Sequence, residues 1–150
     1  MRLVIQRVSK ASVNVKDKEI SSIKKGMLIL VGVGNEDSPD DVEWLAAKAA
    51  NMRIYPDDNG VMNLSLKDID GEALVVSQFT LMASTKKGNR PSYIHAAGHD
   101  TAIPLYENFC LRLSQIIGKE VKKGIFGADM MVSLINDGPV TVIIDSKLKE

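Results

Sequence analysis

Two short motifs contain the residue types that could do chemistry, and each interrupts an apolar stretch. The first is SQFTL, residues 77–81, in which Ser77 and Thr80 offer hydroxyl groups and Gln78 offers an amide. A hydroxyl can attack an acyl group, an amide can orient a substrate, and nearby backbone N–H groups can hold an oxyanion. The motif therefore favours acyl transfer. The alternative is the simple alternation of a strand, with Phe79 on one face and its polar neighbours on the other.

The second motif is NDGPVT, residues 136–141, which places Gly138-Pro139 inside what otherwise reads as a strand. Proline has no N–H for a sheet ladder, so it is usually confined to edges, turns and bulges. Asp-Gly between two apolar runs predicts a hairpin turn, with Pro139 starting the return strand. The alternative is a cis Gly138-Pro139 bond, whose two flanking carbonyls would form a rigid acceptor pair for a ligand's amino group.

No conventional catalytic or cofactor-binding set accompanies these motifs. A Ser or Thr nucleophile normally needs a base, and the only histidines, His95 and His99, read as ordinary loop residues without the Glu of a metal-binding helix motif. The chain has no G-x-S-x-G elbow, C-x-x-C pair, P-loop or Rossmann glycine pattern. The single cysteine, Cys110, lies among apolar residues and is expected to be buried and structural. We therefore expect no metal and no cofactor.

The elements that must position the motifs follow from the periodicity of the apolar residues. Strands are predicted at 2–8, 12–15, 19–23, 26–34, 72–83, 130–136 and 139–145, and helices from Pro39 after a capping Ser38 and from about 101 to 117. The strands arrive in runs joined by short turns and do not alternate strictly with helices. We therefore expect a single α+β domain over residues 1–150, a mostly antiparallel, barrel-like sheet with two packed helices.

Composition limits the class of partner. The chain has 150 residues, with 19 Lys and Arg balanced by 19 Asp and Glu, so a strongly basic nucleic-acid binder is not indicated. Local contacts to phosphate are still possible at three basic clusters, Lys24-Lys25, Lys86-Lys87-Arg90 and Lys119-Lys122-Lys123, although a solvated surface is the simpler interpretation. The N-terminus lacks a signal peptide's apolar core, and no apolar run approaches the roughly 20 residues of a membrane span. With one cysteine, a reducing, cytoplasmic location is expected.

Together the motifs resemble a known family. SQFT and NDGPVT, with MRLVIQRVSKASVNV, GMLILVGV, GNRPSY and FGADMMVSLINDGPVT around them, make essentially the whole chain similar to the D-aminoacyl-tRNA deacylases, often called D-Tyr-tRNA(Tyr) deacylases. The resemblance implies proofreading: hydrolysis of the ester in D-aminoacyl-tRNA, bound by its acceptor 3′ end, to free D-amino acid and tRNA. It also implies a homodimer with the active site at the interface. Because glycine has no side chain, glycyl-tRNA mischarged on tRNA(Ala) is expected to enter the same pocket.

The resemblance also assigns roles to residues. Gly138-Pro139 would be cis and would project into the partner subunit's pocket, where its carbonyls meet the substrate's α-amino group and exclude an L side chain. Arg7 would fix the orientation of this motif. The residues implied to line the pocket are Ser77, Gln78, Phe79 and Thr80, with Met130 beside them.

The catalytic step and the class of function both keep alternatives at this point. Thr80 could attack as a nucleophile, or backbone N–H groups near Phe79 and Thr80 could hold the oxyanion while the terminal ribose 2′-OH assists; we favour the second. The competing functions are a module that binds tRNA acceptor ends without hydrolysis, and a small-molecule Ser/Thr hydrolase or deaminase. A pure interaction protein would leave both motifs unexplained.

Overall fold

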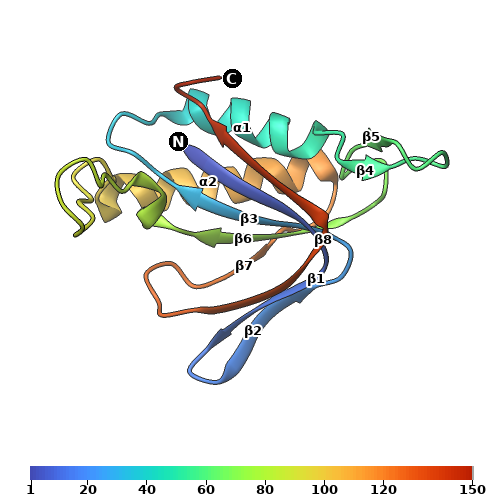
Figure 1. Cartoon of the computed structure of the whole chain (residues 1–150), viewed down its shortest axis with the longest axis horizontal. Coiled ribbons are helices and arrows are strands. Elements are labelled where there is room, and N and C mark those ends of the chain that lie inside the picture. The colour runs from blue at the N-terminus through green and yellow to red at the C-terminus, as the bar shows by residue number, and fades with distance from the viewer. Residues whose placement is uncertain (150) are drawn as a thin grey trace.

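The structure, a computed structural model, describes residues 1–149 and consists of a strongly curved sheet with two helices along one side (Figure 1). The elements in chain order are β1 (Arg2–Val15), β2 (Lys18–Ile23), β3 (Gly26–Gly32), α1 (Pro39–Asn51), β4 (Tyr55–Pro56), β5 (Met62–Leu64), β6 (Glu72–Ser77), the 3₁₀ helix η1 (Phe79–Met82), α2 (His99–Ile117), β7 (Lys122–Lys123) and β8 (Met131–Asp145). Within residues 1–149, no helix is long and apolar enough to cross a membrane.

Strand β1 organises the sheet because it pairs with three other strands. It runs antiparallel to β8 along nearly its whole length, to β3 through its first half and to β2 through its second half. Strand β6 adds to β3, and β7 adds to β6, both in parallel. Strand β2 also contacts β6 and β7, so the sheet curls into a nearly closed barrel (Figure 1).

The expected fold class is confirmed as α+β with two helices and a barrel-like sheet, but the expectation of a mostly antiparallel sheet is wrong. The sheet is mixed, since β3–β6 and β6–β7 are parallel pairs. The physical reason lies in the connections. Helix α1 with the β4–β5 hairpin joins β3 to β6, and α2 joins β6 to β7, and such crossovers return the chain in its original direction.

Two apolar clusters lie on opposite faces of the central strands. One fills the space between the sheet and the two helices and includes Ile29 of β3 and Val75 of β6. The other fills the inside of the curled sheet and includes their neighbours Leu28 and Leu74. The predicted burial of the 26–34 run on both faces is therefore confirmed, although its strand ends at Gly32. Strands buried on both faces are typical of parallel pairs covered by helices.

Both predicted helices are present with nearly the expected bounds. Helix α1 begins at Pro39 after Ser38, whose N–H donates to the Asp41 carboxylate at 2.8 Å, so the predicted start is confirmed. Helix α2 begins at His99, two residues earlier than expected, and ends before Gly118, which has φ +70°. Such a left-handed glycine is the usual helix stop.

Three strand predictions are wrong in ways that matter for the motifs. The 72–83 run is a strand only to Ser77 and continues as the 3₁₀ helix η1. The 130–136 and 139–145 runs are one strand, β8, along a single neighbour, so Asp137-Gly138 is not a hairpin turn. The 2–8 and 12–15 runs likewise form one strand, β1. The apolar pattern correctly predicts that a strand is present in each case. It cannot, however, indicate where the neighbouring strands begin and end.

The parallel β3–β6 pair depends on close backbone approach at Gly26. A β-carbon there would lie 1.8 Å from the carbonyl oxygen of Glu72, which only a backbone shift could relieve. We expect Gly26→Ala to lower the free energy of unfolding by about 3 kcal/mol or more, measured by urea denaturation. Gly98→Ala is the matched control, since nothing lies within 4 Å of its β-carbon position, and its cost should stay below about 1 kcal/mol. Equal losses for the two variants would contradict this account.

Candidate active site

A pocket of about 640 Å³ opens where the parallel strands β3 and β6 end. Its wall comes from the ends of these strands, the start of η1, Tyr93, residues 96–98, the first turn of α2 and residues 126–130. Ligand sites in α/β sheets commonly lie beyond the carboxyl ends of parallel strands, because the connections diverge there. The crossovers that made the sheet mixed therefore also create the pocket.

The SQFT motif forms the turn by which the chain leaves the sheet at this pocket. The N–H of Gln78 donates to the Val31 carbonyl at 2.7 Å, and the N–H of Leu81 donates back to the Gln78 carbonyl at 3.1 Å. The first N–H groups of a helix have no partner within it. Among the hydrogen bonds of residues 1–149, none uses the N–H groups of Phe79 or Thr80 as donors. Two free backbone donors thus sit at the start of η1, beside the pocket.

The structure brings most of the predicted motif residues to the pocket. Ser77, Gln78, Phe79 and Met130 line it, whereas Thr80 does not. The Gln78 side-chain amide donates a hydrogen bond to the Thr80 hydroxyl oxygen, and within residues 1–149 no carboxylate or imidazole hydrogen bonds to that hydroxyl. The geometry therefore gives Thr80 an amide neighbour but no general base.

Aromatic side chains form the rim of the pocket. Phe79 is 56% exposed, and its ring meets the ring of Tyr93 edge to face, with centroids 5.0 Å apart. On the other side, His99 packs edge to face against Phe126 at 5.8 Å. The sequence predicts an ordinary loop residue at His99, but it is the first residue of α2 and lines the pocket. The SQFT motif predicts Phe79, but sequence reasoning missed Tyr93, His99 and Phe126 at the rim because the segments that carry them meet only through the fold.

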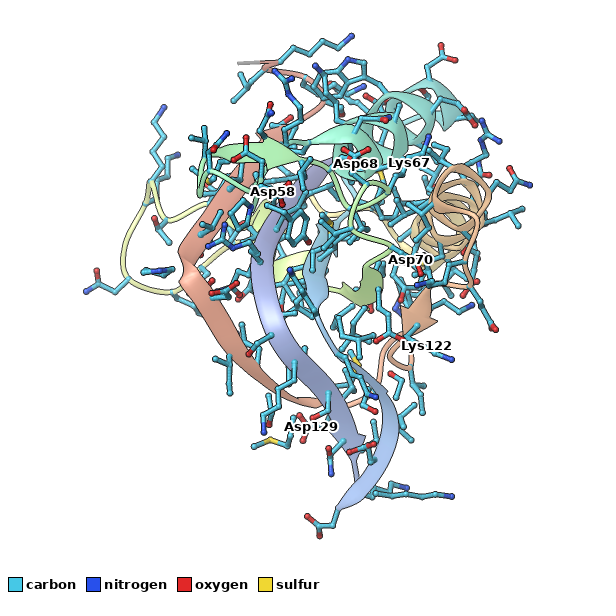
Figure 2. The ribbon with its side chains drawn as sticks, turned by 90° about the vertical axis from the view of Figure 1, so that its right-hand side faces the viewer. Asp58, Lys67, Asp68, Asp70, Lys122 and Asp129 are labelled. Carbon is cyan, nitrogen blue, oxygen red and sulfur yellow. The ribbon has the colours of Figure 1, made fainter. Side chains whose placement is uncertain are left out.

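Asp129 is the carboxylate that lines the pocket, from the segment just before β8. Figure 2 shows it near the lower end of the β8 ribbon, well apart from the charged residues around the β4–β5 hairpin, such as Asp58 and Asp68. The rest of the pocket wall is mainly apolar and backbone. A site of this composition can hold an acyl group and polarise its carbonyl, but it offers few side chains for proton transfer.

The Gly138-Pro139 motif protrudes from β8 as a four-residue loop. In the β1–β8 ladder Gln6 pairs with Thr141 and Val8 with Asn136, so the single residue Arg7 faces residues 137–140. The Gly138-Pro139 bond is cis, and both residues are exposed. The side chain of Asn136 closes the base of the loop, accepting from the Val140 N–H at 3.2 Å and donating to the Thr141 hydroxyl at 2.9 Å.

The side chain of Arg7 anchors this loop to the rest of the fold. Its Nε donates to the Asp137 carbonyl at 3.0 Å, and its Nη1 donates to the Ile54 carbonyl at 2.6 Å. A β-carbon at Gly138, whose φ is +128°, would lie 2.8 Å from Nη2 of the same guanidinium. Tyr55 is buried next to this group with its hydroxyl unpartnered, and burial raises the pKa of that hydroxyl. The positive φ, which L side chains rarely adopt, and the position of Arg7 together favour glycine at 138.

The two motifs do not meet within one chain. The pocket is lined by Ser77, Gln78 and Phe79 but not by Arg7 or the 137–140 loop. In Figure 1 the chain that follows β6 lies at the left, whereas the bend of β8 near its label lies towards the right. Any joint action of SQFT and Gly138-Pro139 therefore needs contact between two molecules.

The remaining candidate groups are structural. Cys110 is buried, and burial raises the pKa of its thiol to about 12, so the expectation of a structural cysteine is confirmed. Within residues 1–149 no group of three or more His, Cys, Asp or Glu side chains is arranged to hold a metal ion.

Comparison with known proteins decides the family. The profile of the family described as D-Tyr-tRNA(Tyr) deacylase matches residues 4–145. The chain belongs to this family. It is 61% identical over 150 residues to the D-aminoacyl-tRNA deacylase of Flavobacterium psychrophilum and 60% identical over 150 residues to that of Porphyromonas gingivalis, each match covering 100% of both chains. The resemblance inferred from the motifs is confirmed, and with it the class of enzyme, a hydrolase of the aminoacyl-tRNA ester.

Solved structures support the fold. A chain described as c-Myc DNA Unwinding Element Binding Protein superimposes with a TM-score of 0.92 at 37% identity, covering 97% of this chain and 98% of that one. A chain described as a probable eukaryotic D-amino acid tRNA deacylase gives a TM-score of 0.82 at 17% identity, covering 95% and 97%. The second likeness concerns the fold alone.

The hydrogen bonds of Asn136 predict a local role in holding the 137–140 loop. We expect Asn136→Ala to speed amide hydrogen exchange at Val140 by about tenfold, as losing one hydrogen bond of about 1.4 kcal/mol would, while global stability changes by less. Asn63→Ala is the control, because Asn63 makes a comparable exposed bond to Asp57 at 3.3 Å elsewhere. Unchanged exchange at Val140, measured by NMR, would contradict the role.

Proposed function

We propose that this protein hydrolyses the ester that joins a D-amino acid to the 3′ end of tRNA, releasing the D-amino acid and tRNA, and rejects L-aminoacyl-tRNA. The observation that carries the proposal is the pair of free N–H groups at Phe79 and Thr80 beside the apolar pocket, in a chain of the deacylase family. An aminoacyl ester is already activated, so a pocket that positions it and stabilises negative charge is sufficient for hydrolysis.

The proposed assembly is a homodimer in which each Gly138-Pro139 loop enters the partner subunit's pocket. The loop is exposed, anchored by Arg7 and remote from the pocket of its own chain, which supports this arrangement. Large apolar side chains are exposed along the same strand, with Met131 at 71%, Ile135 at 51% and Ile143 at 65%. Exposed apolar surface of this kind is typical of an interaction site.

Chirality would then be read by backbone and not by side chains. Enantiomers have the same composition, so only geometry separates them. With the α-amino group held by the carbonyls of the loop, an L side chain would point into the loop and clash, whereas a D side chain would point away from it. Nothing needs to grip the D side chain, so many D-amino acids would be accepted. Glycine would also enter, which extends the proposal to glycyl-tRNA(Ala).

The proposed chemistry uses water and the substrate's own ribose. Water adds to the ester carbonyl carbon, and the N–H groups of Phe79 and Thr80 stabilise the oxyanion. The intermediate then collapses as the bond to the ribose 3′-oxygen breaks, and that oxygen takes up the proton that the attacking water loses. The adjacent 2′-OH assists the proton transfer. The side-chain amide of Gln78 donates a hydrogen bond to the Thr80 hydroxyl oxygen, so this oxygen has a donor beside it and not a base. This contact supports the water route over attack by Thr80.

Matched D-Tyr-tRNA and L-Tyr-tRNA test the proposed function, with EDTA present and enzyme far below substrate. We expect release of D-tyrosine alone. Gly138→Ala should narrow or abolish this preference, because its β-carbon would displace the loop from Arg7. Folding of the variant is checked by circular dichroism and by its oligomeric state.

Each outcome of this assay is decisive. Equal rates on the two substrates would show that the protein is not a chiral filter. Binding of both tRNAs without release would favour the acceptor-end binding module. Hydrolysis of simple esters in preference to either tRNA would favour a small-molecule hydrolase.

Thr80→Ala separates the two catalytic routes. We expect single-turnover hydrolysis of D-Tyr-tRNA to stay within about tenfold of the unaltered protein, since the backbone N–H remains. A D-Tyr-tRNA ending in 2′-deoxyadenosine should instead lose about a hundredfold or more with the unaltered protein, an effect comparable to losing one oxyanion donor. The reverse pattern would assign the attack to the Thr80 hydroxyl.

A further inference from the structure

Residues 85–91 form an exposed loop that is fixed to the rim of the pocket. The N–H and carbonyl groups of Ser84 and Ser92 bond to each other in both directions, at 2.8 and 2.9 Å, and close the base of the loop. All seven residues between them are exposed. Tyr93 follows the base directly and packs on Phe79 at the rim. The loop is therefore held beside the pocket mouth while its tip faces solvent.

This loop carries positive charge that forms no ion pair within the described residues. It contains Lys86, Lys87 and Arg90, and no Asp or Glu occurs between Glu72 and Asp100. None of the ion pairs within residues 1–149 includes these three cations. A cluster of unpaired cations on an exposed loop is a site for an anionic ligand.

The Lys119-Lys122-Lys123 cluster differs from this loop in position, and two of its three cations are paired. Lys119 pairs with Asp70 at 3.0 Å, and Lys123 pairs with Glu107 at 2.7 Å. This cluster also lies away from the pocket, because Asp70 precedes the first residue of β6 and Lys122 pairs with Leu74 in the middle of that strand. The pocket lies at the opposite end of the strand, at Ser77.

Lys24 and Lys25 also lie away from the pocket. They precede the first residue of β3, whereas the pocket lies at the opposite end of that strand. Of the three clusters, only the 85–91 loop combines unpaired charge with a place beside the pocket.

We propose that the 85–91 loop binds the phosphates of the single-stranded 3′ end of the tRNA. This inference rests on the proposed function. With the terminal ester in the pocket, the phosphodiester groups that precede the last nucleotide must lie outside the pocket, next to its opening. Arg90 can meet a phosphate with two parallel hydrogen bonds, and Lys86 and Lys87 act as point charges. The contacts are to backbone phosphates, so they bind any tRNA without reading its sequence.

The test compares two triple variants that remove equal charge. Lys86→Gln with Lys87→Gln and Arg90→Gln removes the loop charge, and Lys24→Gln with Lys25→Gln and Lys122→Gln removes three exposed, unpaired cations elsewhere. Both are assayed on D-Tyr-tRNA and on D-tyrosyl-adenosine, which has the same ester but no phosphate. Each substrate concentration series is repeated at several salt concentrations.

The loop variant should raise KM for D-Tyr-tRNA by at least about tenfold at 0.1 M salt, with a much smaller change in kcat. The slope of log affinity against log salt should fall by about 2, since each single-strand phosphate contact contributes about 0.7. Hydrolysis of D-tyrosyl-adenosine should change far less, and the control variant should behave as the unaltered protein.

Three results would overturn the inference. Equal weakening by the control variant would mean that total charge and not the loop matters. An unchanged salt slope would mean that the loop makes no phosphate contacts. Equal loss on D-tyrosyl-adenosine would mean that the loop shapes the pocket. If the unaltered protein hydrolyses neither substrate, the proposed function fails first and this inference with it.

Discussion

The ladder between β1 and β8 is the interaction on which the rest of the structure depends. Strand β1 bonds to β8 on one edge and to β3 and β2 on the other, so it joins both halves of the barrel. The ladder is interrupted at two places only, Arg7 and Ser9. The interruption at Arg7 makes the Gly138-Pro139 loop. Because β1 continues on both sides of the interruption, the loop is held by regular strand at each end. A loop held in this way can present backbone atoms with little freedom to move.

The second interruption, at Ser9, changes which way β1 faces. Leu3 and Ile5 belong to the cluster beneath the helices, whereas Val8 and Val13 belong to the cluster inside the barrel. The side chains of a strand alternate, so a shift of one residue exchanges its faces. The two irregularities thus have separate effects. The one at Ser9 lets a single strand serve two cores, and the one at Arg7 exposes the Gly138-Pro139 loop. The two helix crossovers then place the pocket at the far ends of β3 and β6.

Local signals in the sequence are sufficient to predict the helices and the motifs. Ser38-Pro39 and Gly118 mark helix ends, and the apolar run at 26–34 correctly predicts burial on both faces. What the sequence does not supply is non-local. A strand over the whole of 72–83 is wrong because β3 stops at Gly32 and leaves no partner beyond Ser77. A hairpin at Asp137-Gly138 is wrong because β1 offers one continuous partner to both apolar runs.

The candidate site shows the same division between local and non-local information. Ser77, Gln78 and Phe79 are predictable because the motif that contains them is unusual, and Met130 is predictable only through the family resemblance. All four line the pocket. Tyr93, Phe126 and Asp129 are not predictable as pocket residues because their segments meet only after the crossovers form. The neutral net charge conceals the separation of charge as well, since carboxylates are absent from the whole stretch between Glu72 and Asp100.

A site built from backbone suits a task in which the ligand's composition carries no information. Side-chain hydrogen bonds distinguish groups that differ chemically, and D and L amino acids do not differ in that way. Discrimination between the two enantiomers must come from a rigid surface. A backbone loop held by hydrogen bonds from Arg7 and Asn136 moves less than a flexible side chain. The polymer attached to the amino acid poses the opposite problem, since it must be gripped without regard to sequence. Exposed cations on the 85–91 loop would meet that need, so the proposed functions assign chirality and tRNA binding to different parts of the fold.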